Sequence, residues 1–261
     1  MNALRIIGAF LKLNVQVALA YRSEAVVQIL LNLMWLGWEL TSLAIIFANT
    51  NELGGWGPAE LIALLGVWRL VNTMMSIIVW PNTEKFNQGL RDGSLDYTFL
   101  QPANSQFLVS ITRVELWRLW DFVIAVVLIV AGLGMSGRVA APANIATFLA
   151  LTVSGAAVLY SLWIVMIAVT FWFTRFDNNV TILAALMDAG RFPAQVYPFW
   201  LRLLITFIIP IAVATTVPLQ GLRGELAWWE VAGFLALGVA AVFLSSRLWK
   251  AGVRRYSGAS S

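Results

Sequence analysis

The chain has 261 residues, of which 60% are hydrophobic and only 11% are charged, and its formal net charge is +4. A soluble domain of this length needs more charge to cover its surface, so the composition indicates an integral membrane protein. Because the sequence has no cysteine and no histidine, disulfides, Cys or His metal sites, haem ligation and Cys–His or Ser–His–Asp catalysis are excluded.

The first predicted element covers residues 1–22. Leu4, Ile7, Leu11 and Val15 share one helical stripe, and charged or amide side chains interrupt the other faces. This pattern favours an amphipathic helix that lies in the membrane interface, with a weak first span as the alternative.

Long apolar segments follow along the rest of the chain. A helix needs about 20 apolar residues to cross the hydrocarbon core, which limits this chain to roughly five to eight spans. The hydropathy pattern predicts an all-α membrane fold with six spans in a single domain, residues 1–261. The predicted spans cover 24–47, 58–80, 114–134, 144–173 and 227–248, with one further span in the region 177–218.

The region 177–218 allows two interpretations. Hydropathy alone favours a span at 199–217, but four prolines interrupt the region, and helix breaks persist at membrane depth only where protein or water satisfies the freed backbone groups. The alternative is a fifth span at 178–197 followed by two short re-entrant helices at 198–218. The four prolines are Pro193, Pro198, Pro210 and Pro218.

The basic residues predict the orientation. Most Lys and Arg fall near the N-terminus, within 81–121, after the fourth span and at the C-terminus. The positive-inside rule therefore predicts a multi-pass protein with both termini in the cytoplasm. The positive charge indicates this topology and contact with anionic head groups rather than nucleic-acid binding.

Two charges fall well inside predicted spans. Glu39 and Arg69 each cost at least about 2.5–3.5 kcal/mol at the bilayer centre on insertion scales. They form either a structural ion pair, which we favour, or part of a substrate path. Two isolated charges without histidine are too few for a proton relay.

The stretch 81–101 is the longest polar segment. Asn82 to Glu84 opens a short amphipathic helix in which Phe86 and Leu90 share a face, and Gly93 to Asp96 ends it. A cytoplasmic helix of this kind suits docking onto a soluble partner, and resting on the lipid surface is an equal alternative.

Two segments resemble type 2 ABC exporter permeases, in particular a subfamily of small six-span permeases. The segment RDGSLDYTFLQPANSQF (91–107) is similar to the segment that follows their second span, although Gln101 stands where a basic residue is common. The segment 191–222 is similar to their proline-rich region, with all four prolines matched. The resemblance covers the whole chain in the number and order of spans.

The resemblance implies a permease subunit of the plasma membrane, here the bacterial cytoplasmic membrane, that exports a hydrophobic or amphipathic substrate by alternating access. It implies a cytoplasmic ATPase dimer as partner, a second permease chain (the same or a similar one), and extracytoplasmic re-entrant helices at 198–218. The implied ATPase-coupling residues are Thr83, Phe86, Asn87, Leu90, Asp92, Leu95 and Asp96. The expected substrate path comprises Trp35, Trp38, Glu39, Trp68, Arg69 and Asn72, and the re-entrant gate comprises Pro193, Tyr197, Pro198, Pro210 and Pro218.

No G-x-x-x-x-G-K-[ST] loop is present. We therefore expect no enzymatic activity, no metal and no cofactor in this chain, with ATP and Mg²⁺ bound by the partner ATPase. The alternatives are an ion-gradient-driven secondary transporter, which repeat symmetry would support, and a channel. A further alternative is a membrane enzyme that modifies lipids. Its catalytic polar groups would have to come from the region of Glu115 and Asp121.

Overall fold

The computed structural model describes residues 16, 22–115, 118–137, 140–172, 184–185, 187–208 and 210–256. Within these ranges the chain is helical and has no β-strand, which confirms the prediction of an all-α membrane protein. The interfacial helix expected at 1–22 lies almost entirely outside the described residues. The same holds for much of the fifth span expected at 178–197.

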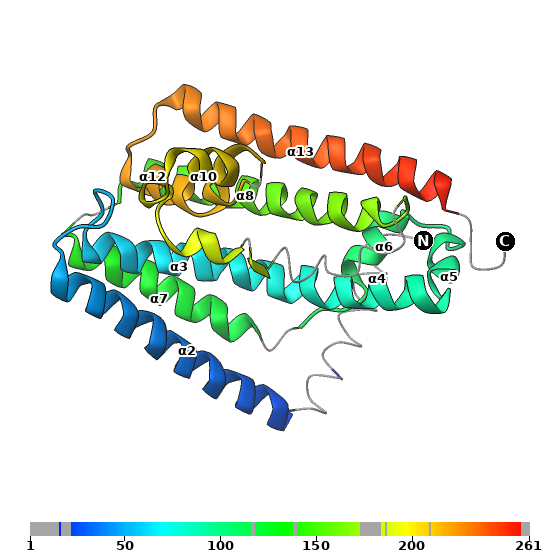
Figure 1. The fold of residues 1–261 in the computed structure, drawn as a ribbon, viewed down its shortest axis with the longest axis horizontal. Helices are drawn as coiled ribbons and strands as arrows, with labels where there is room; N and C mark the ends of the chain where they lie inside the picture. Colours follow the sequence, from blue (N-terminus) through cyan, green and yellow to red (C-terminus); the bar gives the residue numbers. More distant parts are fainter. Residues whose placement is uncertain are drawn as a thin grey trace.

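Four helices of the described ranges are long and apolar enough to cross a membrane. Figure 1 shows them lengthwise in one bundle, with α2 along one edge and α13 along the other. The shorter apolar helix α7 (Leu119–Met135) packs against α3. The four long helices are α2 (Arg22–Asn49), the continuous run of α3 (Pro58–Met74), η1 (Met75–Val79) and α4 (Trp80–Asp92), α8 (Pro142–Val169), and α13 (Trp228–Arg255).

The helix expected to open at Asn82 is continuous with the second span. Pro81 lies in the first turn of α4, and the π-helical turn η1 carries the helix through it. Proline has no N–H to donate, and the carbonyl of Ile77, four residues earlier, instead accepts from the backbone N–H of Glu115 at 3.2 Å. The helix ends at Gly93, whose φ of 76° suits glycine.

The third apolar helix, α7, begins at Leu119, later than the expected start at residue 114. Asn82 explains the delay, because its Nδ2 donates to the carbonyls of Ser110 and Arg113 and its Oδ1 accepts from the Arg113 N–H. These bonds use backbone groups that a helix would need. The preceding short helices are α5 (Leu95–Phe99) and α6 (Ser105–Ile111).

Glycines bring α3 and α7 into backbone contact. A Cβ on Gly132 would lie 2.5 Å from the Ala59 carbonyl oxygen, and one on Gly66 would lie 2.7 Å from the Ile129 nitrogen. Small residues that allow close approach are the usual basis of helix packing in membranes, where lipid is as apolar as the side chains. This packing holds α3 at the centre of the bundle.

The proline-rich region is a series of short helices. Pro193 separates η3 (Ala189–Arg191) from η4 (Ala194–Val196), so no single helix runs to residue 197 as the expected fifth span would require. Beyond it, Phe199–Thr206 and Ile211–Arg223 meet at a bend of 64°. The pieces after Pro198 are α10 (Phe199–Leu203), η5 (Leu204–Ile208), α11 (Ile211–Ala214) and α12 (Thr216–Arg223), with α10 and α12 at one end of the bundle in Figure 1.

Candidate functional site

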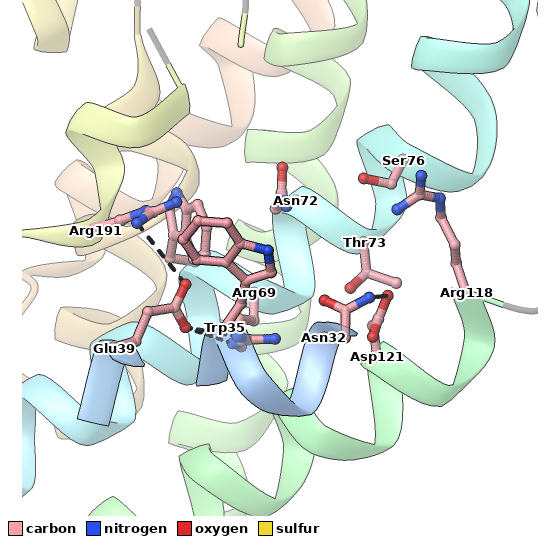
Figure 2. A pocket seen from close by; sticks show the side chains of 11 residues that line it. Asn32, Trp35, Glu39, Arg69, Asn72, Thr73, Ser76, Arg118, Asp121 and Arg191 are labelled. Atoms are coloured by element: carbon pink, nitrogen blue, oxygen red, sulfur yellow. Dashed lines mark hydrogen bonds and ion pairs between the residues drawn. The ribbon is translucent and has the colours of Figure 1, made fainter. Parts of the chain in front are cut away.

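A cavity of about 250 Å³ lies between α2, α3, the start of α7 and η3. The spacing of its residues follows one face of each helix: positions 32, 35 and 39 on α2, and positions 69, 72, 73 and 76 on the continuous run of α3 and η1. Figure 2 shows these polar side chains converging from the separate helices. The cavity is lined by Asn32, Trp35, Glu39, Trp68, Arg69, Asn72, Thr73, Ser76, Arg118, Asp121 and Arg191.

An ion pair joins α2 to α3 at the cavity wall. Arg69 donates from Nε and Nη2 to the same oxygen of Glu39, at 2.9 Å and 2.6 Å. Both side chains are buried, with 9% exposure for Glu39 and 6% for Arg69. Because a lone buried charge is costly to hold in a membrane, each of these residues is stabilised by the other.

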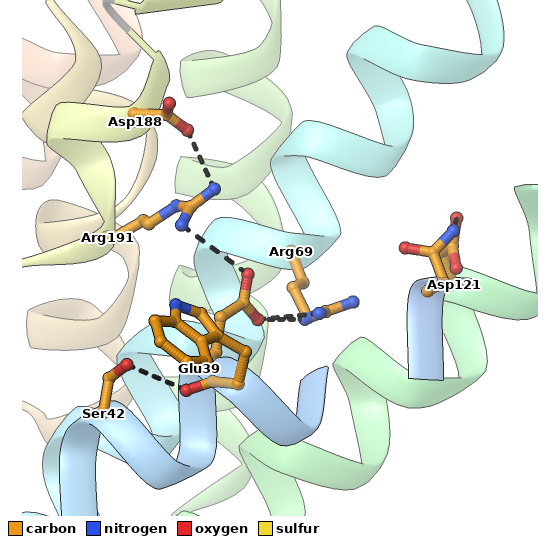
Figure 3. A network of polar contacts seen from close by, with 8 residues as sticks. Glu39, Ser42, Arg69, Asp121, Asp188 and Arg191 are labelled. Carbon is orange, nitrogen blue, oxygen red and sulfur yellow. Dashed lines mark hydrogen bonds and ion pairs between the residues drawn. The ribbon is translucent and has the colours of Figure 1, made fainter. Parts of the chain in front are cut away.

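Arg191 adds a second cation to the same carboxylate (Figure 3). Its Nη1 lies 3.9 Å from Glu39 Oε1, which is charge contact without a hydrogen bond. Its guanidinium carbon lies 4.4 Å from the centre of the Trp68 ring, a cation–π contact. Trp68 also donates from Nε1 to the Met187 carbonyl at 2.7 Å, so the segment 187–191 is tied to α3 twice.

The other end of the cavity holds Asp121, which is 7% exposed and accepts from Asn32 Nδ2 at 3.3 Å. Arg118 beside it pairs with Glu115 at 2.6 Å, an i,i+3 contact. The sequence suggested Asp121 only for the alternative of a lipid-modifying enzyme, and Asn32 and Arg191 were not selected. The seven-residue spacing of Asn32 and Glu39 was the signal available for Asn32.

Five of the six residues expected on the substrate path line this one cavity. The sixth, Trp38, does not, and it is 66% exposed. It follows Trp35 by three residues but precedes Glu39 by one, so it lies at the edge of the polar face of α2 and outside the cavity lining.

The expected coupling face of α4 is directed into the chain itself. Phe86 is 2% exposed and belongs to an aromatic cluster, which we define as Phe86, Phe99, Phe171, Trp249 and Tyr256. Its ring lies 5.8 Å from Phe171 and 6.0 Å from Trp249. Leu90 packs against the same core. The interpretation of Phe86 and Leu90 as a free docking face therefore differs from the structure, because α4 packs against the ends of α8 and α13.

The remaining residues of the coupling region differ in how far their side chains are exposed. Thr83 and Leu95 are buried, at 2% and 5%. Asp92 and Asn87 lie nearer the surface, and the Asp92 carboxylate accepts from the Ser94 N–H at 2.9 Å. The most exposed apolar side chains of the region are Tyr97 at 75% and Leu100 at 80%, neither of which was selected from the sequence.

Arg202 and Tyr197 make the polar contacts around the first of the expected gate residues. Arg202 donates to the backbone carbonyls of Ala194 and Gln195, at 3.2 Å and 2.8 Å, and so ties α10 to η4. Tyr197 donates from its hydroxyl to the Ala189 carbonyl at 2.9 Å. Of the prolines, Pro193 and Pro218 are buried, Pro198 is exposed, and Pro210 precedes α11 at the bend.

Comparison with known families decides the class of this helical bundle. Residues 33–260 match the family described as ABC-2 family transporter protein. The chain belongs to the ABC-2 transporter family. Searches of the curated proteins and of the solved structures find no match.

The match confirms the resemblance to type 2 ABC permeases that the two sequence segments indicated. An ABC-2 transporter protein is the membrane component of its transporter and not the nucleotide-binding subunit, so association with an ABC ATPase follows from the family. The matched range contains the cavity residues from Trp35 to Arg191 and the whole coupling region.

Proposed function

We propose that this ABC-2 transporter protein is the permease subunit of an exporter in which a separate cytoplasmic ATPase, with its own ATP and Mg²⁺, drives alternating access. The observation that carries the proposal is the charged cavity between α2, α3, α7 and η3. It lies along helices apolar enough to cross a membrane, where polar groups are expensive unless they serve a path or a partner.

In this proposal the end of the bundle that bears α4, α5 and α6 is cytoplasmic. The C-terminal end of α13, with its basic residues Arg247, Lys250, Arg254 and Arg255, lies at the same end in Figure 1. The bent pair of helices at 199–223 lies toward the opposite end, where a re-entrant gate would close the path. The proposed transporter has two permease chains, each with six spans, and two ATPase subunits.

We propose that the ATPase contacts exposed side chains of the coupling region and not the buried ones expected from the sequence. Tyr97 and Leu100 are apolar and solvent-exposed at the proposed cytoplasmic end, whereas Phe86 and Leu95 are buried within the chain. A large exposed apolar pair beside charged residues is typical of a protein contact. We therefore place Tyr97 and Leu100 at the ATPase surface, with Asp92 and Asn87 beside them.

The docking proposal is tested with the double variant Tyr97→Asp, Leu100→Asp, expressed together with its ATPase. We expect the ATPase to be lost from the purified permease, because two charges would replace apolar contact area. Trp228→Asp is the control, since Trp228 is 78% exposed but lies at the start of α13. Equal recovery of the ATPase with the double variant and with the control would contradict the docking surface.

Alternating access is tested at the cavity itself. The natural chain has no cysteine, so Asn72→Cys introduces a single thiol at the cavity wall. We expect its rate of maleimide labelling to differ between the nucleotide-free complex and the vanadate-trapped complex, while Met135→Cys, which is 65% exposed near the end of α7, labels equally in both. Equal labelling of Asn72→Cys in the two states, or transport by the permease alone with an ion gradient, would reject the mechanism.

A further inference from the structure

Arg191 has hydrogen-bond donors that the described contacts do not use. Its Nη2 pairs with Asp188 at 3.0 Å, and the Asp188 side chain is 61% exposed. Its Nη1 is too far from Glu39 for a hydrogen bond, and its Nε is buried with no partner among the described residues. Since a guanidinium has five N–H groups and a buried donor without a partner is costly, Arg191 has donors left for a further acceptor.

The surroundings of Arg191 define what that acceptor must be. Trp68 covers one face of the guanidinium, which leaves the N–H groups at its edge for a planar partner. The fork of N–H groups in arginine matches the paired oxygens of a carboxylate or a phosphate. Arg69 lines the same cavity and uses only Nε and Nη2 on Glu39.

Both carboxylates of the cavity already have partners. Glu39 already receives two hydrogen bonds from Arg69. Asp121 receives one from Asn32, and the charges of Arg118 and Arg69 act on it. An amine would have to compete with these groups for either carboxylate, whereas an oxyanion would supply what Arg191 lacks.

We propose that the cavity binds the anionic head of an amphipathic molecule, a carboxylate or a phosphate monoester, with Arg191 as the receiving residue and Arg69 beside it. The inference rests on the proposed function, because it names the substrate class of the same cavity. The apolar part of the molecule lies along Trp35, which lines the cavity and is 56% exposed on the lipid-facing side of α2, next to the exposed Leu31 and Met34.

The proposal is tested by binding to the purified permease in nanodiscs, without ATPase. The probes are dodecyl phosphate, dodecanoate, dodecylamine and dodecanol, which differ in the head group, and native mass spectrometry counts the molecules retained by each chain. We expect the two anions to be retained in preference to the amine and the alcohol. Inorganic phosphate as a competitor shows whether the head group alone is enough for binding. Displacement of dodecyl phosphate at millimolar phosphate indicates that a free oxyanion suffices, and no displacement indicates that the apolar chain is required.

Variants assign the binding to Arg191. Arg191→Gln should weaken dodecyl phosphate binding about 10-fold or more, because a charge-assisted bond is lost, while Arg191→Lys retains part of it. Arg254→Gln is the matched control, since Arg254 is exposed on the last turn of α13. Asn72→Asp, which adds a carboxylate to the cavity wall, should also weaken anion binding and covers the case in which Arg191→Gln fails to fold.

Three results would overturn the proposal: equal retention of dodecanol and dodecyl phosphate, unchanged anion binding in both Arg191→Gln and Asn72→Asp, or preferential retention of dodecylamine that Asp121→Asn abolishes. None of them bears on the ATPase contact at Tyr97 and Leu100, because these measurements omit the ATPase. Failure of the anion site and failure of the transporter proposal are therefore distinguishable.

Discussion

Glu39 receives both of its hydrogen bonds from Arg69 on a single carboxylate oxygen, and so joins α2 to α3. The second oxygen faces Arg191 at 3.9 Å, so one carboxylate balances two guanidinium groups from different elements. Of the residues in the candidate span α2, only a small share is buried, with Leu36, Leu40 and Leu43 packed against the cluster around Trp68. The ion pair is therefore a principal polar attachment of α2 to the bundle.

We predict that Glu39→Gln destabilises the chain by about 3–5 kcal/mol, because it leaves Arg69 as a buried charge without its counterion. The double variant Glu39→Gln, Arg69→Gln should lose less stability than Glu39→Gln alone. The measurement is equilibrium unfolding of the detergent-solubilised protein. Glu52→Gln is the control, since Glu52 is exposed in the loop after α2. Additive losses in the double variant would contradict the pairing.

We predict that Phe86→Ala lowers the free energy of unfolding by about 3–5 kcal/mol, because it leaves a void in the aromatic cluster. Tyr97→Ala, only 11 residues later in the chain but 75% exposed, should change it little. Thermal unfolding followed by circular dichroism compares the two. Equal and small effects would show that Phe86 is not buried in the membrane-embedded protein.

We predict that Gly132→Ala separates α3 from α7 and destabilises the chain by about 1–3 kcal/mol, as overpacking does. The added Cβ would lie 2.5 Å from the Ala59 oxygen and the Ala63 nitrogen, both backbone atoms that cannot turn aside. Gly134 is on the same helix, and a Cβ there would meet nothing within 4 Å. Gly134→Ala should therefore be neutral or slightly stabilising in the same unfolding measurement, and similar losses for both variants would argue against the contact.

We predict that stability falls with rising pH above about 10 through Tyr256. Burial raises the pKa of this phenol, and the hydrogen bond and the charge of Asp96 raise it further. The unfolded chain therefore releases this proton at a lower pH than the folded chain, and stability is lost as pH rises from the unfolded pKa through the folded one. Tyr256→Phe should reduce the slope of melting temperature against pH. Identical slopes for wild type and Tyr256→Phe would refute the assignment.

Hydropathy and motif spacing were sufficient for the class of protein and for the existence of the long helices. The apolar segments of α2, α3, α8 and α13 are long enough to span by themselves, so their location depends on local composition. The residues at which helices begin were less predictable. The late start of α7 depends on Asn82 and on the carbonyl of Ile77 that Pro81 frees, and these contacts join residues about 30 positions apart.

Part of the candidate cavity was also predictable from local composition. Glu39, Arg69 and Asn72 are conspicuous as polar residues within apolar helices, and five of the six expected residues converge. Arg191 was not selected, because contacts made only after folding bring its segment to α3, namely the bond from Trp68 to the Met187 carbonyl and the cation–π contact of Arg191 with Trp68.

By itself, the sequence determined the membrane environment, the helical class and the family, because each of these depends on local hydropathy or on short motifs. Only the tertiary structure decided which way each face points. The apolar face of Phe86 and Leu90 is equally suited to a partner, to lipid or to the chain's own core, and the positions of α8 and α13 place it in the core. The structure likewise brought Arg191 to Glu39 and Trp68, because side chains distant in sequence share a cavity only after the helices have packed.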